Sequence, residues 1–396
     1  MANVMLSNVI RRAQTKVDKD NTDLIFYVGG EHIVSENIRV HSRGIIAEST
    51  IGPMFYYGFK AGDFLLVSRN PHLKKAGLVD FDGICSEKTF VLETADSDVL
   101  LPEFLPFVLQ NERFWDYAYR HRHGSTNTFI NWSTLANYEF ELPDLETQRK
   151  LAEVLWSIND TMDAYKKLIS ATDELVKSQF MEQFVIEAPY ERTRLGDHIS
   201  QIRGVSYKPA DLRPSLSEES VLLLRANNIG AGRINHDEVQ YVAKEKVSTV
   251  QLIRAGDILM CASSGSLEHV GKAAICLPSI EGETFGAFCK LIRPKGDLLP
   301  EYIAAYFETD EYREIIMQLA CGSNINNLKA EHIDELQIPT PPAEVQEAFV
   351  SFLRQSDKSK FAALQCCSQS IMPHNDKLYD FLGTYHGSMA IACMLL

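Results

Sequence analysis

Phe59-Lys-Ala-Gly-Asp-Phe-Leu-Leu66 and Ile253-Arg-Ala-Gly-Asp-Ile-Leu-Met260 are two copies of one pattern, in which a polar turn leads into an apolar run typical of a strand. Further matches follow each copy in the same order. They are Leu100-Leu-Pro-Glu-Phe-Leu105 with Leu298-Leu-Pro-Glu-Tyr-Ile303, Gly124-Ser125 with Gly322-Ser323, Pro143 with Pro341, and Glu146-Thr-Gln148 with Glu344-Val-Gln346. These later matches share a single offset, so the chain contains an internal repeat whose two halves are expected to share one fold.

Each half contains short runs of β-branched and aromatic residues separated by Gly, Asn and Asp turns, which predict strands. The predicted strands are 24–28, 64–68 and 89–92 in the first half, and 221–224, 258–261 and 287–292 in the second. Leu-Pro-Glu then predicts the start of a helix, because proline in the first turn loses no hydrogen bond and glutamate complements the helix dipole. That helix is expected to end near the Gly-Ser pair. Each half is therefore predicted to be one α+β domain.

Between the halves, uncharged residues recur at alternating spacings of four and three. The apolar members are Leu151, Leu155, Ile158, Met162, Tyr165, Ile169 and Val176, with polar Thr172 and Gln179 in the same series. A heptad pattern sustained over about four heptads predicts a helix that pairs with another helix. The alternative is one amphipathic helix lying on a globular core, but such a helix usually has a wider apolar face.

The corresponding segment after the second half begins in the same way, with Phe349 and Leu353. Ser356 and Lys360 then occupy seam positions, and Pro373 stops the helix. This second helix is therefore predicted to be shorter and weaker than the first. The chain is expected to divide into similar domains at 1–143 and 188–341, a central helix at 144–187, a second helix at 342–372, and an atypical C-terminal tail at 373–396.

Composition excludes several classes of protein. The 396 residues are 45% hydrophobic and 23% charged, which fits one or two globular cores and not a disordered chain. A net charge of −14 argues against a uniformly basic nucleic-acid binder and leaves local basic patches possible. The eight cysteines form no CxxC pair, and no signal peptide or membrane-spanning run is apparent. These features predict a soluble cytoplasmic protein with reduced thiols.

The sequence contains none of the common catalytic and metal-binding signatures. The sequence has no phosphate loop, GxGxxG after a strand, HExxH, GxSxG or Asn/Asp-Pro-Pro-aromatic motif. His121 and His123 lie beside Arg120 and Arg122, whose charge opposes a bound cation. We therefore expect no catalytic residue, no metal site and no cofactor bound by this chain.

Turns that combine Arg, Lys, Asn and Ser are the candidate binding residues, because Arg and Lys pair with guanine edges or phosphates and Asn pairs with adenine. In the first half they are Arg11, Arg12, Arg69, Asn70, Lys74, Arg120, Arg122, Ser125 and Asn127. In the second half they are Arg203, Lys208, Arg225, Asn227, Asn228, Arg233, Lys272, Ser323, Asn324, Asn326 and Asn327. The alternative for each is a solvated turn or a cation at a helix end.

The assembled pattern resembles the specificity subunit of type I restriction-modification systems. The resemblance rests on the two-fold repeat, the Ala-Gly-Asp, Leu-Pro-Glu and Gly-Ser motifs, and Ile338-Pro-Thr-Pro-Pro-Ala-Glu-Val-Gln346 running into a helix. The first copy, Phe140-Glu-Leu-Pro-Asp-Leu-Glu-Thr-Gln148, lacks the first of these prolines, and the tail after Pro373 also departs from the family.

The resemblance implies that each half is a target recognition domain that grips one part of a split, asymmetric sequence in double-stranded DNA. It also implies that the two long helices form an antiparallel coiled coil. The helices would act as a spacer and dock two methyltransferase subunits, to which translocating restriction subunits add. S-adenosylmethionine, ATP and Mg would then be bound only by the partner subunits, in a bacterial or archaeal cytoplasm. A central helix of that length would measure on the order of 60 Å, at about 1.5 Å per residue.

Two other interpretations remain open. One is a scaffold whose halves bind polypeptides, and the other is a defective or recombination-reservoir copy, suggested by the unusual tail. DNA recognition predicts an affinity for duplex DNA that falls steeply with salt, whereas a scaffold would ignore DNA.

Overall fold

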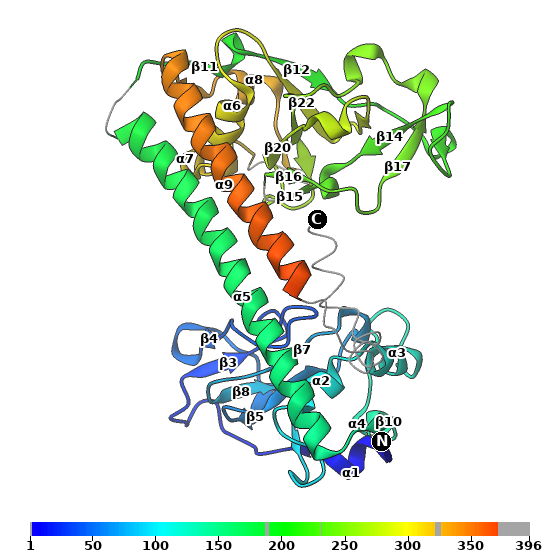
Figure 1. Cartoon of the computed structure of the whole chain (residues 1–396). Helices are drawn as coiled ribbons and strands as arrows, with labels where there is room; N and C mark the ends of the chain where they lie inside the picture. The colour runs from blue at the N-terminus through cyan, green and yellow to red at the C-terminus, as the bar shows by residue number, and fades with distance from the viewer. Residues whose placement is uncertain (1, 187–189, 231, 321–325, 371–396) are drawn as a thin grey trace. The chain divides into compact units, whose positions relative to one another are not determined.

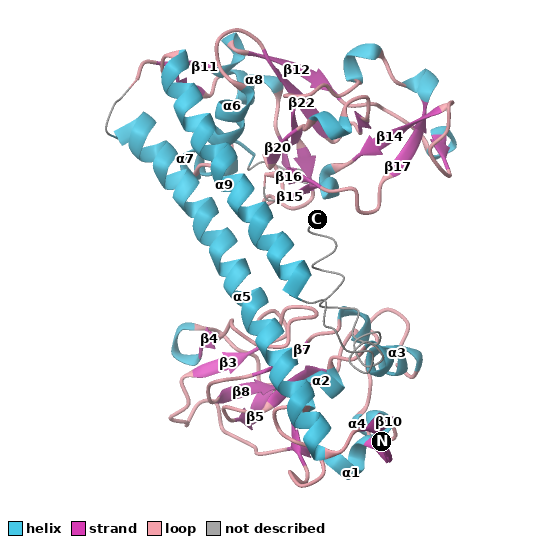
Figure 2. Ribbon diagram, viewed as in Figure 1, coloured by secondary structure: helices cyan, strands magenta, loops and turns pink. Residues whose placement is uncertain are grey.

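The structure is a computed structural model that describes residues 2–186, 190–230, 232–320 and 326–370. Ser323, Asn324 and the predicted tail at 373–396 lie outside the described residues. The described chain divides into two compact units. The first unit contains the residues up to Lys167 and those from Phe361 onward, and the second contains Leu168–Lys360. Both units contain helices and strands, as α+β domains require (Figure 1, Figure 2).

The first unit contains two four-stranded sheets and one two-stranded pair. Its strands are β1 (Ala2–Met5), β2 (Ile10–Ala13), β3 (Phe26–Val28), β4 (Gly44–Ile45), β5 (Phe55–Phe59), β6 (Phe64–Val67), β7 (Ala76–Leu78), β8 (Gly83–Ser86), β9 (Thr89–Thr94) and β10 (Glu139–Leu142). One sheet has the order β2-β9-β6-β7 and is antiparallel throughout. The other has the order β4-β3-β8-β5, with β3 and β8 parallel, and β1 pairs with β10.

The second unit repeats this plan. Its strands are β11 (Arg192–Arg194), β12 (Ile199–Arg203), β13 (Leu212–Arg213), β14 (Ser220–Leu224), β15 (Ile229–Gly230), β16 (Arg233–Ile234), β17 (Gln240–Ala243), β18 (Ile258–Cys261), β19 (Ser263–Ser264), β20 (Ala273–Ile275), β21 (Thr284–Phe285), β22 (Cys289–Pro294), β23 (Asn326–Asn327) and β24 (Gln337–Pro339). The antiparallel sheet β12-β22-β18-β20 matches β2-β9-β6-β7. A second sheet, β13-β17-β14-β21, again contains one parallel pairing, between β14 and β21.

The Ala-Gly-Asp motif forms the same turn in both units. Gly62 and Gly256 have φ values of 95° and 84°, in the region that favours glycine. The aspartate carboxylate accepts the backbone N–H three residues earlier, at 2.7 Å from Lys60 to Asp63 and at 2.8 Å from Arg254 to Asp257. The turn leads into the fully buried strand β6 or β18, so the motif starts one of the two inner strands of each antiparallel sheet.

The helices of each unit cover its antiparallel sheet. They are α1 (Leu6–Val9), α2 (Leu105–Leu109), α3 (Glu112–Arg120), α4 (Trp132–Leu135), α5 (Leu145–Met181), α6 (Pro300–Tyr306), α7 (Asp310–Ala320), α8 (Ala330–Asp334) and α9 (Ala343–Ser370). The prediction of a single helix between Leu-Pro-Glu and Gly-Ser is wrong in both halves, because α2 and α3, like α6 and α7, are separate helices. The reason is a capping residue. Before α3, the side chain of Asn111 accepts a hydrogen bond from the N–H of Arg113. Before α7, the Thr309 hydroxyl accepts a hydrogen bond from the N–H of Tyr312.

A buried glutamine fixes the start of each long helix, which explains the Glu-x-Gln motif. Gln148 at the start of α5 is fully buried, accepts the N–H of Leu101 at 3.0 Å, and donates to the carbonyls of Val99 and Pro143. Gln346 at the start of α9 makes the same set of bonds with Leu299, Asp297 and Pro341. Each long helix is thereby joined to the Leu-Pro-Glu segment of its own half.

Within the second unit, α5 and α9 run antiparallel. Phe180 of α5 lies 5.6 Å from Phe349 of α9 between ring centroids, while Asp173, earlier in α5, pairs with Lys360, later in α9. Lys360 is buried and also bonds to Asp357 at 3.2 Å. The lysine that interrupts the second heptad pattern therefore has a partner on α5, and such a buried pair fixes the register of two helices.

Apolar clusters form separate cores in the two units. Phe64, Leu92, Phe104 and Phe114 belong to the core beneath the antiparallel sheet of the first unit. No helix in the described part of the chain is long and apolar enough to cross a membrane. Among the described residues no cluster of His, Cys, Asp or Glu could hold a metal ion. Among the cysteines whose side chains the structure describes, Cys85, Cys261, Cys276 and Cys289 are buried and free, and burial raises the pKa of Cys85 to about 12.

Candidate nucleic-acid interface

Three loops meet at one corner of the first unit, just after β6 ends. The N–H and the hydroxyl of Ser68 both donate to the carbonyl of Lys88 at 2.7 Å. The N–H of Asn70 donates to the carbonyl of Thr128 at 2.7 Å, and Arg69 forms a β-bridge with Phe129. We call the residues 68–70, 86–88 and 123–130 the first corner.

The first corner exposes side chains that can bind a nucleic acid. Arg69, Lys88, Ser125 and Asn127 are exposed, and Asn70 is half-buried in a left-handed turn. The structure therefore brings together four residues predicted from the sequence, at 69, 70, 125 and 127. Lys88 lies 2.5 Å from Glu87, and hydrogen bonds from Lys88 and Tyr56 lower the pKa of that carboxyl. Arg69 has no such close acidic partner among the described ion pairs.

Arg120 and Arg122 lie at the C-terminal end of α3. Arg120 is 3.7 Å from Asp116 and well exposed. Arg122 donates to the carbonyl of Tyr119 at 2.6 Å and its guanidinium lies 3.7 Å from the centre of the Tyr119 ring. Both positions suit a cation at a helix end, which was the alternative interpretation of these residues. Both residues border the first corner, and Arg120 is the less tightly bonded of the two.

Three other predicted residues of the first unit are engaged within the fold. Arg11 bonds to Glu93 at 2.9 Å. The guanidinium of Arg12 lies over the Phe90 ring at 4.6 Å. Lys74 pairs with Glu36 and Glu112 at 3.0 and 2.5 Å. Contact with a ligand by Lys74 would require breaking its ion pairs, whereas Arg11 is bonded through its Nε alone and its side chain is largely exposed.

The second unit builds a corner at the equivalent place. The N–H groups of Ala262 and Ser263 donate to the carbonyl of Phe288 at 2.9 and 3.0 Å, as Ser68 does to Lys88. Ser263–Ser264 pair with Asn326–Asn327 as β19 and β23, where the first corner has the bridge between Arg69 and Phe129. We call 262–264, 286–288 and 326–327 the second corner. Its side chains carry hydroxyl, amide and aromatic groups in place of charges.

The predicted turn at 225–228 is mainly structural. Asn228 is fully buried; it accepts the N–H of Arg225 at 2.9 Å and donates to the carbonyl of Asp237 at 2.7 Å. This is a correction to the sequence-based selection, because a side chain in that position cannot reach a ligand. Arg225 donates to the carbonyl of Glu238 at 2.6 Å, whereas Asn227 is exposed.

The remaining predicted residues of the second unit are spread over its surface. Arg203 and Lys208 are exposed, on and after β12, and Asn327 is exposed in the second corner. Arg233 is 3.9 Å from Asp357 of α9. Of Asn326 the structure describes the backbone pairing alone.

Lys272 lines a cavity of about 150 Å³ with Lys177, Gly232, Phe307, Glu308, Asp310 and Arg313. Burial raises the pKa of Glu308 to about 7, although nearby lysines and Arg313 act in the opposite direction. The cavity mixes cations with two carboxylates and is small. It therefore lacks the shape of a groove for a duplex.

The predicted heptad residues serve two environments. Leu151 and Leu155 pack against the core of the first unit, as in the alternative of a helix on a globular core. Val176, Phe349 and Leu353 pack in the core of the second unit, where the two long helices meet. Of the others, Met162 is buried and Ile158, Tyr165 and Ile169 are half-buried.

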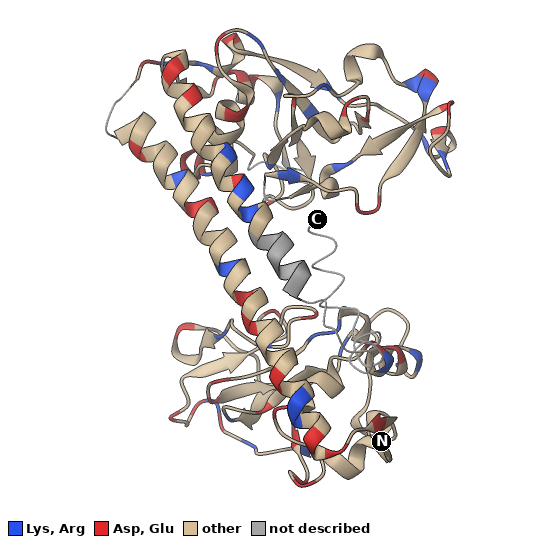
Figure 3. Ribbon diagram, in the orientation of Figure 1, with Lys and Arg blue, Asp and Glu red and all other residues tan. Residues whose placement is uncertain are grey.

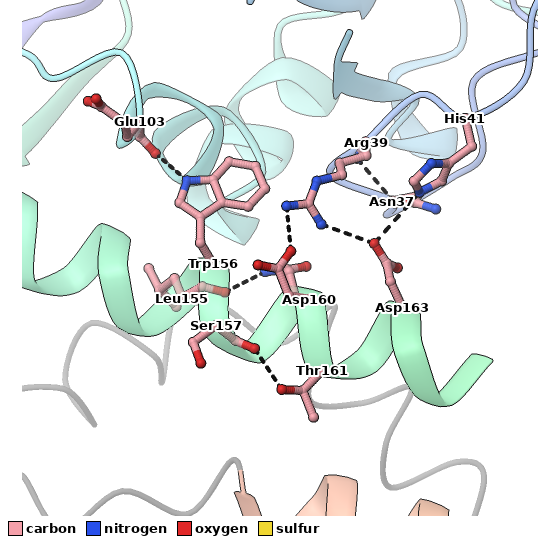
Figure 4. A network of polar contacts seen from close by, with 11 residues as sticks. Asn37, Arg39, His41, Glu103, Leu155, Trp156, Ser157, Asp160, Thr161 and Asp163 are labelled. Carbon is pink, nitrogen blue, oxygen red and sulfur yellow. Dashed lines mark hydrogen bonds and ion pairs between the residues drawn. The ribbon is translucent and has the colours of Figure 1, made fainter. Parts of the chain in front are cut away.

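A polar network ties a loop of the first unit to α5 (Figure 4). Arg39 bonds to Asp160 at 2.6 Å and to Asp163 at 3.1 Å, and its guanidinium lies 4.5 Å from the centre of the Trp156 ring. The Trp156 indole donates to the carbonyl of Glu103 at 2.8 Å. This network holds the domain on its own helix and was not predicted from the sequence.

Sequence reasoning also missed Lys88, Ser263, Ser264 and Phe288. The repeat contained the signal, because the Ala-Gly-Asp alignment places Arg69-Asn70 opposite Ser263-Ser264. Selecting residues by charge failed in the second half, because the equivalent residues Ser263, Ser264 and Phe288 are uncharged.

Comparisons with known proteins agree with this architecture. The family model for the type I restriction modification DNA specificity domain matches residues 225–365. The type I restriction enzyme StySPI specificity subunit of Salmonella potsdam and the EcoKI specificity subunit of Escherichia coli (strain K12) are each 37% identical over 163 residues. Each match covers 40% of this chain and 35% of the relative, so it spans about a third of the relatives' length.

The likeness of fold extends further than the likeness of sequence. The crystal structure of a type I restriction-modification system S subunit from M. genitalium superposes with a TM-score of 0.51 at 13% identity, covering 99% of this chain and 95% of that one. The resemblance predicted from the sequence is thus confirmed: residues 225–365 match the type I restriction modification DNA specificity domain, and the chain is similar in sequence and in fold to type I specificity subunits.

Proposed function

We propose that this chain is the non-catalytic, sequence-recognising subunit of a type I restriction-modification complex, and that each half reads one part of a bipartite target in double-stranded DNA. The observation that carries the proposal is the pair of equivalent corners. One backbone arrangement, repeated in both units, presents Arg69 and Lys88 in one and Ser263, Ser264 and Asn327 in the other. A shared frame with different side chains is what reading two different sequences requires.

The chemistry of the two corners differs in a way that favours different bases. Arg69 can donate two hydrogen bonds to the O6 and N7 of guanine, and exposed Lys88 can contact a phosphate. Asn327 can bond bidentately to adenine, and serine hydroxyls can donate to or accept from any base edge. The two parts of the target should therefore differ in sequence, as an asymmetric target requires.

The long helices supply a surface for partner subunits. A second stripe along α5, distinct from the heptad seam, carries no charge and is exposed or half-exposed. Its members are Val154, Ser157, Thr161, Ala164, Leu168, Ala171, Leu175 and Ser178. Leu168 and Leu175 are each 53% exposed, which costs free energy unless another protein covers them. Acidic and basic residues occupy other faces of α5 (Figure 3).

We propose that two methyltransferase subunits dock on the long helices and that restriction subunits join through them. Those partners would bind S-adenosylmethionine, ATP and Mg and carry out all chemistry, in the cytoplasm of a bacterium or archaeon. The net charge of −14 then predicts that the isolated chain binds DNA weakly and that the partners supply much of the phosphate contact.

An exchange of recognition domains tests the proposal. Residues 188–341 are replaced by the equivalent segment of another specificity subunit, and the hybrid is purified with its methyltransferase. Mapping of methylated adenines should find one part of the target changed and the other part retained. A change in both parts would refute the modular assignment, and methylation without sequence preference would refute DNA recognition by this chain.

A further inference from the structure

Phe288 is a large aromatic residue that the second unit leaves 67% exposed. It lies in the turn between β21 and β22. The backbone of this turn is firmly held: the carbonyl of Phe288 accepts the N–H groups of Ala262 and Ser263, and Gly286 bonds to the carbonyl of Leu224 at 2.9 Å. The exposed ring is therefore presented from an ordered backbone and not from a loose loop.

The surroundings of Phe288 are suited to bases. The paired segments β19 and β23 place serine hydroxyls and the Asn327 amide in the same corner, and neither segment contributes a charge. Such groups bond to base edges, while an aromatic ring stacks on the face of any base. An apolar ring exposed beside hydrogen-bonding groups is also the arrangement by which proteins wedge open a step of duplex DNA.

In the first unit the position equivalent to Phe288 is occupied by Lys88. Lys88 has the equivalent backbone bond, from Ser68, and carries an exposed ammonium paired with Glu87 where the second unit has the phenyl ring. The corresponding corner keeps an aromatic residue, Phe129, but that ring is only 36% exposed. Lys88 and Phe288 thus occupy the same backbone position in the two corners but differ in chemistry.

We propose that Phe288 stacks on the bases of the second part of the target and wedges into one base step, whereas Lys88 contacts a phosphate in the first part. The inference rests on the proposed function. It makes Phe288 a determinant of specificity, because the cost of opening a base step depends on the sequence at that step.

The test uses the full chain in complex with its methyltransferase subunits and a target duplex that carries 2-aminopurine at each position of the second part in turn. Besides any adenine that the methyltransferase itself extrudes, binding of the wild-type complex should raise the 2-aminopurine fluorescence at one further position, where Phe288 breaks the stacking. Phe288→Ala should abolish that rise and weaken binding on the order of tenfold. Phe288→Trp should retain both the rise and the affinity.

Two matched controls accompany these variants. Leu277→Ala removes another exposed apolar side chain of the second unit, which is 59% exposed and lies outside the corner, and should change neither readout. Lys88→Ala should leave the fluorescence rise intact and reduce the salt dependence of binding by about one phosphate contact. Thermal unfolding of each variant checks that it folds.

The inference is overturned if Phe288→Ala behaves like Leu277→Ala in both fluorescence and affinity while the wild-type complex recognises a bipartite target. A wild-type complex that recognises no such target would instead overturn the proposed function, and with it this inference. The two failures are therefore distinguishable.

Discussion

Gln148→Ala removes a side chain that joins the start of α5 to the first domain. Gln148 is fully buried and its amide makes three hydrogen bonds, one accepted from Leu101 and two donated to the carbonyls of Val99 and Pro143. Alanine makes none of them, and it leaves the carbonyl of Pro143 without this bond in a buried site and the Leu101 N–H and Val99 carbonyl without theirs in part-buried sites. The same change at Gln346 removes the equivalent set in the second half.

The size of the effect follows from the number of bonds. A neutral hydrogen bond contributes roughly 0.5–1.5 kcal/mol, and a buried group left unpaired costs about 1–3 kcal/mol. Loss of three such bonds should therefore lower the free energy of unfolding by about 3 kcal/mol. Gln355→Ala provides the control, because Gln355 is exposed on α9 and its loss should change that free energy by less than about 0.5 kcal/mol.

Urea unfolding followed by two probes can separate the halves. The three tryptophans, at positions 115, 132 and 156, all belong to the first unit, so tryptophan fluorescence reports on that unit, whereas circular dichroism reports on both. Gln148→Ala should shift the fluorescence transition, and Gln346→Ala should shift the dichroism transition alone. Equal shifts of the fluorescence transition by both variants, or no shift beyond that of Gln355→Ala, would refute the reasoning.

Three further predictions concern other parts of the chain. Burial raises the pKa of Glu308 from about 4.5 to about 7, so the carboxyl stays protonated up to a higher pH in the folded state than in the unfolded state, and stability is lost as pH rises between these values. Glu308→Gln should therefore raise the urea midpoint of the dichroism transition at pH 8 but not at pH 4. An equal rise at both pH values would show that ionisation of Glu308 is not the cause. Arg39→Ala should lower the free energy of unfolding of the first unit by about 2 kcal/mol, because charged hydrogen bonds and the contact with Trp156 are lost; tryptophan fluorescence in urea measures this change. An unchanged fluorescence transition would mean that the network of Figure 4 contributes nothing to stability. Asn228→Ala should lower the free energy of unfolding by about 2 kcal/mol because its buried hydrogen bonds are lost, whereas Asn227→Ala should preserve stability and weaken target binding by the complex. Unchanged stability in Asn228→Ala together with lost stability in Asn227→Ala would contradict these roles.

The repeat and the strands could be predicted because they depend on local chemistry. The Ala-Gly-Asp turns need glycine at positive φ and an aspartate acceptor, and both are visible in the sequence. The break between α2 and α3 was missed although Asn111 followed by an acidic residue is a capping signal, because the apolar pattern continues across it.

The candidate site was harder to predict because exposure and pairing depend on the fold. Asn227 and Asn228 are adjacent and chemically identical, yet one is exposed and the other closes a turn. Lys360 was interpreted as a flaw in a heptad seam, and its partner Asp173 lies far away in the sequence. The second corner was missed at Phe288 because composition directs attention to charge, whereas this corner is built from uncharged groups.

The central claim is that this chain alone chooses the DNA sequence that its complex modifies. The most direct measurement is a map of methylated adenines in cells that express the methyltransferase with and without this chain. The account predicts methylation at one bipartite, asymmetric sequence when the chain is present and none at that sequence when it is absent. The same methylated sequence in both cells, or a continuous target, would contradict it.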